Sequence, residues 1–209
     1  MIFFRRVGTK GDSTGLEDKI NFAVFPSTQG GPHNNTIAGI AVALKQAASP
    51  AFRAYSNSVR RNAVVLADTL RSFGYQICTD GTDNHIVLWD LRPQKLTGSK
   101  MEKICEMAHM TINKNSVAGD QSAMTPGGVR LGTPALTTRG FTEEHFKTIA
   151  ELLHRAVEIA LNIQASCSSK LLKDFTAAAQ GNPDLLQLKG DVEALATQFH
   201  LPGVTNLNV

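Results

Sequence analysis

The feature of this sequence that most constrains its fold is a long amphipathic stretch between a proline and a glycine. After Pro50, apolar residues recur at steps of three and four until Gly74, which places them on one face of an α-helix. They are Phe52, Tyr55, Val59, Ala63, Leu66, Leu70 and Phe73. A helix of this length with one apolar face needs an extended surface to pack against. We predict that it connects two parts of the chain.

The pattern changes from helical to alternating directly after this stretch. Residues 75–79 and 85–90 are predicted strands of a hairpin. Residues 108–114 and 129–132 are two further candidate strands, and the Gly/Ser/Pro-containing stretch 116–128 between them is too long for a simple hairpin turn. These strands indicate a small, mostly antiparallel sheet with one long loop, and loops of that length are often functional.

Helices are predicted on both sides of these strands. One covers about residues 99–109. Another begins at Thr142, where two glutamates suit the helix N-terminus. Its apolar face comprises Phe146, Ile149, Leu153, Val157 and Ala160. Residues 168–199 support two more helices, separated by a turn at residues 181–183.

The first fifty residues have a different pattern. Residues 2–4 read as a short buried strand, and residues 21–25 as a strand or loop that stops at Pro26. A tight glycine turn follows, and then a helix over about residues 37–47. We therefore expect an α/β protein in which residues 1–50 are the end of one α/β layer, residues 51–74 a connecting helix, and residues 75–209 a small α/β domain.

Composition excludes several classes of protein. The 209 residues are 42% hydrophobic and 19% charged, with a net charge of +3, which is the balance of an ordinary globular protein. The basic residues are scattered, which argues against a nucleic-acid-binding arm. No apolar run approaches the ~20 residues of a membrane span. Cys78, Cys105 and Cys167 have no metal-ligand spacing, so we predict free thiols in a reducing compartment and no metal site.

Gly30 and Gly31 form the first candidate site. Adjacent glycines leave backbone N–H groups open to close approach, and a helix starting just after them adds partial positive charge, a combination suited to a phosphate. The alternative is a plain tight turn, which Gly-Gly-Pro forms more often than an anion site.

Arg130 is the second candidate site. It lies in a predicted strand between apolar neighbours, where a buried guanidinium needs an anionic partner, and its planar fork matches a carboxylate. The open alternatives are a bound ligand and a structural ion pair. Arg139, in the following loop, reads as a solvated arginine. We find no spacing typical of a nucleophilic triad, a carboxylate pair or a metal centre.

Two long segments resemble serine hydroxymethyltransferase, a family of pyridoxal-phosphate (PLP) enzymes. They are residues 20–47, which include Phe25-Pro26 and the glycine turn, and residues 129–140, which include Arg130. The resemblance extends to about Leu201. It implies the fold-type I, aspartate-aminotransferase-like architecture, with the end of the large cofactor domain followed by the C-terminal small α/β domain.

The resemblance also implies roles for individual residues. Gly30 and Gly31 would hold the cofactor phosphate of a neighbouring subunit in a dimer or tetramer. Arg130 would bind the carboxylate of serine or glycine, and Asn115 would contact the pterin of tetrahydrofolate. The implied reaction of one-carbon metabolism interconverts serine plus tetrahydrofolate with glycine plus 5,10-methylenetetrahydrofolate. The implied compartment is cytoplasmic or mitochondrial, with the cytoplasm favoured.

The sequence departs from the family pattern in two places. Asn35 stands where many members have histidine, which is a loop change. The family's Schiff-base lysine would lie just ahead of Met1, so no catalytic residue is assigned here. Lys10 is a poor substitute, because it lies in a polar loop with nothing apolar around it. Two alternatives therefore stand beside the enzyme: a non-catalytic or regulatory chain that pairs with a full-length homologue, and another enzyme of the same fold, such as an aminotransferase.

Overall fold

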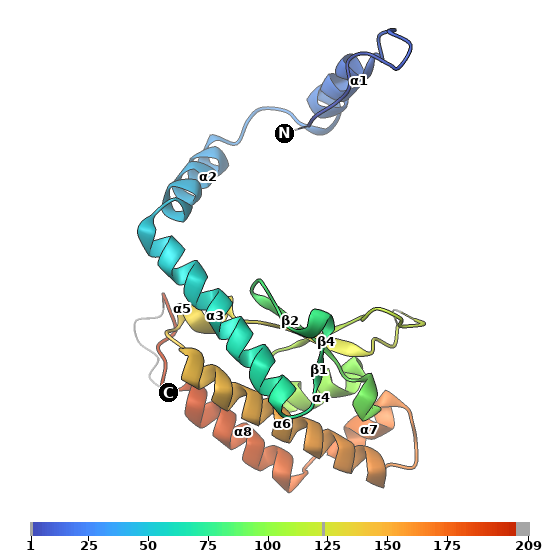
Figure 1. The fold of residues 1–209 in the computed structure, drawn as a ribbon, viewed down its shortest axis with the longest axis vertical. Helices are drawn as coiled ribbons and strands as arrows, with labels where there is room; N and C mark the ends of the chain where they lie inside the picture. The colour runs from blue at the N-terminus through green and yellow to red at the C-terminus, as the bar shows by residue number, and fades with distance from the viewer. Residues whose placement is uncertain (1, 123, 204–209) are drawn as a thin grey trace. The chain divides into compact units, whose positions relative to one another are not determined.

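The computed structural model describes residues 2–122 and 124–203. The chain divides into two compact units, one up to Ser49 and one from Pro50 onward. The predicted helices and most of the predicted strands are present (Figure 1).

The first unit consists of helices and loops. Helix α1 (Leu16–Phe22) runs into an irregular helical turn, η1 (Ala23–Thr28), in which Phe25 is extended. Helix α2 (Asn34–Ala47) follows the glycine turn, as predicted. None of residues 2–49 is buried.

Both strand predictions in the first unit are wrong. Residues 2–4 have no regular structure, and the one bridge nearby joins Val7 to Ser13. The stretch predicted as strand or loop at residues 21–25 is helical at its start, because Asn21 and Phe22 belong to α1. Its apolar alternation is weak, and local helix hydrogen bonds outweigh so short a signal.

The second unit is built on a four-stranded antiparallel sheet in the order β1-β2-β4-β3. Its strands are β1 (Gln76–Ile77), β2 (Ile86–Asp90), β3 (Asn113–Asn115) and β4 (Gly128–Gly132). The predicted hairpin is confirmed, although β1 ends early in the short helical turn η2 (Cys78–Asp80). The strand predicted over residues 108–114 is shorter than expected, because Ala108 still ends the preceding helix.

The helices of this unit are α3 (Pro50–Ser72), α4 (Gly98–Met107), α5 (Pro134–Thr138), α6 (Glu143–Ser166), α7 (Leu172–Ala179) and α8 (Pro183–Ala196), with the short turn η3 (Arg92–Gln94) after β2. Helices α3 and α4 contact the strands of this sheet, and the other helices of the unit pack against those two or against one another. Helix α6 contacts α3, α4, α7 and α8 (Figure 1). Thr142 begins α6 as predicted, with the side chain of His145 accepting from its backbone N–H at 2.9 Å.

The core lies between the helices and one face of the sheet. Val87, Trp89, Val129 and Leu131 point into it from β2 and β4 and are at most 7% exposed. Along α3 the predicted apolar face is buried only in its middle part, at Val59, Ala63, Leu66 and Leu70. The opposite face of the sheet carries Arg130, which is exposed, and lacks a covering helix among the elements of this unit.

Candidate functional site

Arg130 lies on the open face of the sheet, in the middle of β4, with a paired strand on each side. It pairs with Leu88 of β2 on one side and with Asn113 of β3 on the other. Its strand neighbours Val129 and Leu131 point into the core, so strand alternation directs Arg130 away from it. The sequence placed this arginine correctly in a strand.

Arg130 is exposed, and its guanidinium has no anionic partner among the described residues. Within residues 2–122 and 124–203, no carboxylate lies within ion-pair distance of it. Of the two alternatives left open by the sequence, the structural ion pair is therefore not observed among the described residues. A guanidinium on a sheet face is a ready partner for a carboxylate, which it can bind through two parallel hydrogen bonds.

Asn115 lies on the same face as Arg130. It ends β3 and pairs with Gly128, whereas Asn113 pairs with Arg130. Residues two apart along a strand share a face, so Asn115 and Arg130 are diagonal neighbours across two strands. Its amide nitrogen donates to the carbonyl of Ser116 at 2.7 Å. The sheet register therefore brings together two predicted site residues that are fifteen positions apart in the sequence.

Gly30 and Gly31 lie in the other unit, in the exposed loop ahead of α2. A Cβ atom built on either residue meets no other atom within 4 Å. Their backbone is therefore accessible to a ligand. His33 is the residue before α2 and gives no side-chain cap to it, so the first N–H groups of that helix remain available to an anion. Lys10 is exposed in a loop of this unit.

Arg139 is not the solvated loop arginine that the sequence predicted. It is half-buried, and its Nη2 donates to the carbonyls of Ala196 and Phe199 at 2.7 and 2.9 Å. It therefore caps the end of α8, where unpaired carbonyls attract a cation. Its partners lie some sixty residues away, which local sequence could not reveal.

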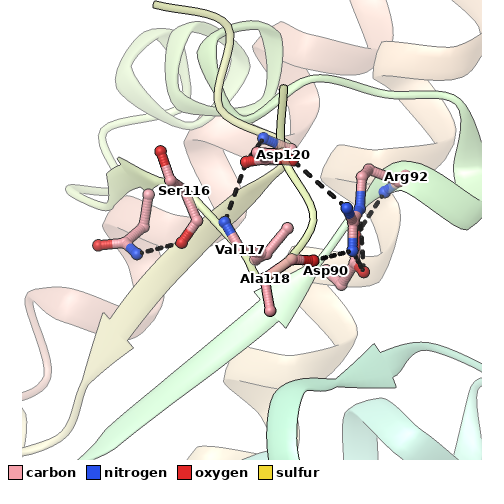
Figure 2. A network of polar contacts seen from close by, with 8 residues as sticks. Asp90, Arg92, Ser116, Val117, Ala118 and Asp120 are labelled. Atoms are coloured by element: carbon pink, nitrogen blue, oxygen red, sulfur yellow. Dashed lines mark hydrogen bonds and ion pairs between the residues drawn. The ribbon is translucent and has the colours of Figure 1, made fainter. Parts of the chain in front are cut away.

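Sequence reasoning missed the polar cluster beside Asn115. Asp90, Arg92 and Asp120 join the end of β2 to the long loop that follows β3 (Figure 2). The hydrogen bonds of Arg92 hold the pKa of Asp90 below its ordinary value, and those from the Gly127 and Val117 amides lower the pKa of Asp120. The only available signal was the Asp-x-Arg spacing, which by itself is common.

The described residues provide neither a metal site nor an activated thiol at Cys78 or Cys105. The described residues contain no group of three or more potential metal ligands. Burial raises the pKa of the Cys105 thiol to about 12, and it also raises that of Cys78, so neither is a reactive thiolate. Among the described residues, no helix combines the length and apolarity needed to cross a membrane.

Comparison with known proteins identifies the family. Residues 1–153 match the family model described as serine hydroxymethyltransferase. The chain is 53% identical over 210 residues to serine hydroxymethyltransferase 4 of Arabidopsis thaliana, covering 97% of this chain and 44% of that protein. It is 48% identical to the cytosolic serine hydroxymethyltransferase of Neurospora crassa, over 97% of this chain and 44% of that protein. A putative mitochondrial serine hydroxymethyltransferase of the same fungus is 44% identical, over 97% and 42%.

The fold class predicted from the sequence is confirmed: the family consists of PLP-dependent transferases of fold type I, and the mixed α/β unit with its small antiparallel sheet agrees with it. The chain belongs to the serine hydroxymethyltransferase family. It spans somewhat under half the length of the relatives named above. These relatives include proteins named as cytosolic and as mitochondrial.

Proposed function

We propose that this chain supplies the carboxylate-binding and folate-facing part of a serine hydroxymethyltransferase site. The reaction interconverts serine plus tetrahydrofolate with glycine plus 5,10-methylenetetrahydrofolate. The observation that carries the proposal is the guanidinium of Arg130 on the open sheet face, which has no carboxylate partner within residues 2–122 and 124–203, with Asn115 diagonally beside it. Family membership supports it.

Each residue would do one task. Arg130 would hold the substrate carboxylate through two hydrogen bonds and so fix the orientation of the amino acid. Asn115 would offer a hydrogen bond to the pterin on the same face. A carboxylate and a folate ring bound at diagonal positions would lie side by side, which is what the transfer of one carbon between serine and folate requires.

The exposed glycine turn fits the phosphate of PLP. Gly30 and Gly31 expose their backbone and a helix N-terminus follows, so they would hold that phosphate through N–H groups. When bound, the cofactor supplies the electron sink for chemistry at the substrate α-carbon. In a dimer or tetramer this loop would reach the cofactor of a neighbouring subunit. We assign no catalytic base or nucleophile to this chain.

The test replaces Arg130 in a complete polypeptide. The segment that precedes the matched region in the Arabidopsis relative is joined to this chain, and serine cleavage is measured with tetrahydrofolate. Arg130→Lys keeps the charge but loses the fork, so kcat/KM for serine should fall at least ~100-fold. Arg155→Lys is the matched control, because Arg155 is paired with Asp191 at 2.7 Å on α8. An active hybrid that tolerates Arg130→Lys would contradict the proposal.

A second function is a non-catalytic chain that pairs with a full-length homologue. The observation that favours it is the apolar surface of α2, where Ile37, Ile40 and Leu44 are 53%, 54% and 65% exposed, since such surfaces mark association. Co-expression with a full-length relative discriminates between the two. If the chain co-purifies with the relative and the hybrid is inactive, the second function is supported. If the chain never co-purifies with the relative, that function is excluded.

A further inference from the structure

One carboxylate oxygen ties together the two ends of the long loop between β3 and β4. Asp120 Oδ2 accepts hydrogen bonds from the backbone N–H of Val117 at 2.9 Å and of Gly127 at 2.8 Å. The Asp120 side chain is only 8% exposed. Hydrogen bonds to a buried carboxylate are stronger than neutral ones, so the loop is closed at its base.

Arg92 attaches this closed loop to the sheet (Figure 2). Its Nε and Nη2 donate to Asp90 at 3.0 and 2.7 Å, and Asp90 is the buried last residue of β2. Nη2 also donates to the carbonyl of Ala118 at 3.0 Å, and Nη1 lies 3.5 Å from Asp120 Oδ1. One guanidinium thus contacts the strand end, the loop backbone and the loop carboxylate.

The backbone of the loop packs closely against this cluster. A Cβ atom on Gly127 would lie 2.6 Å from Asp120 Oδ1 and 2.7 Å from Arg92 Cγ. The N–H of Leu91 donates to the Gly127 carbonyl at 2.9 Å, and that of Gly98 to the Pro126 carbonyl at 2.8 Å. The fit leaves no room for a side chain at residue 127, so the glycine there has a packing role.

We infer that Asp90, Arg92 and Asp120 form a clamp that fixes residues 117–120 and 126–127, near the two ends of the long loop, and thereby positions Asn115. Asn115 directly precedes this loop and pairs with Gly128 at its other end. The inference rests on the proposed function for its folate part, because Asn115 is the pterin contact in that proposal. The clamp residues are positioning residues and touch no substrate.

The electrostatics favour a clamp that stays closed at neutral pH. The carboxylates of Asp90 and Asp120 both have lowered pKa values, through Arg92 in the first case and through backbone amides in the second. Both therefore remain charged from neutral pH down to the ordinary carboxylate range. The ion pair and hydrogen bonds of the clamp are therefore retained at neutral pH.

Amide hydrogen exchange of the purified chain tests the clamp directly. Asp120→Asn removes the charge that Val117 and Gly127 bind, so peptides covering residues 117–127 should exchange at least ~10-fold faster. Asp191→Asn is the matched control, because Asp191 is also ion-paired and hydrogen-bonded, on α8. Unchanged exchange of the loop in Asp120→Asn would overturn the inference.

Two further variants separate charge from shape. Arg92→Lys keeps the positive charge and should retain part of the protection that Arg92→Gln loses. Gly127→Ala keeps every charge but pushes a methyl group against Asp120 and Arg92, and it should open the loop as Asp120→Asn does. A loop that stays protected in both Arg92→Gln and Gly127→Ala would show that these contacts do not hold it.

Steady-state kinetics of the hybrid then tests the positioning of Asn115. Asp120→Asn should raise KM for tetrahydrofolate about 5- to 10-fold and leave KM for serine unchanged, because Arg130 lies outside the loop. An equal rise in both KM values, or in neither, overturns the positioning role. A wild-type hybrid without folate-dependent activity refutes the proposed function and the folate part of the inference, while amide exchange still decides the clamp.

Discussion

The two units of the chain differ in how far their apolar side chains are buried. From Pro50 onward, apolar side chains of helices and strands share one core, in which Leu66, Leu70, Trp89 and Phe146 are at most 2% exposed. Up to Ser49 no described residue is buried, although α2 carries several aliphatic side chains. Helical periodicity alone therefore does not produce a buried core. Burial requires a second surface.

The largest expected difference is in amide exchange of the unmodified chain. Core amides of β2 and α6 should exchange at least ~1,000-fold slower than those of α2, because exchange from a core requires global opening. Mass spectrometry of peptides from both units measures this. Comparable protection in α2 would mean that the first unit has a folding partner, such as a second copy of the chain.

A matched pair of leucines sharpens the same comparison. Leu66→Ala removes a side chain that is 2% exposed, and it should lower the free energy of unfolding by about 2–5 kcal/mol. Leu44→Ala removes one that is 65% exposed, and it should change that quantity by less than about 0.5 kcal/mol. Urea unfolding of the chain measures both. A large effect at Leu44 would contradict the picture of an unburied first unit.

A pair of glycines gives a smaller contrast. A Cβ atom at Gly98 would overlap the Gly128 carbonyl oxygen, whereas one at Gly31 meets nothing within 4 Å. Gly98→Ala should therefore destabilise the second unit by about 1–3 kcal/mol. Gly31→Ala should leave stability unchanged, and in the hybrid it should weaken binding of PLP. If Gly98→Ala unfolds like the parent in urea, the backbones of Gly98 and Gly128 do not approach each other closely.

The smallest effect near neutrality is the pH dependence of the clamp. Asp90 and Asp120 have pKa values below their ordinary range in the folded chain. Their contribution to stability is therefore fully present above pH ~4, the unfolded value, and is lost as pH falls through the folded values. Urea midpoints should be flat from pH 7 to 5 and then fall. In Asp90→Asn the urea midpoint should fall less steeply with decreasing pH. An equally steep fall would mean that other carboxylates cause the pH dependence.

Local sequence was sufficient for part of the fold and of the site. Helical periodicity placed α2, α3 and α6, and the Asp80-to-Asn84 turn placed the hairpin, because each signal depends on neighbours within one or two turns. It failed at residues 2–4 and 21–25, where the apolar runs were too short to choose between strand and helix. It also failed at Arg139, whose carbonyl partners come from the far end of the chain.

The family, the helical framework, the glycine turn and the position of Arg130 in a strand were all predictable from the sequence, because each depends on contiguous residues. The outward direction of Arg130 and the position of Asn115 on the same face came from the tertiary structure, since both follow from strand register. The tertiary structure alone joined Asp90 and Arg92 to Asp120. Contacts between residues nearly thirty positions apart depend on how the chain closes its loops, and no local pattern encodes that.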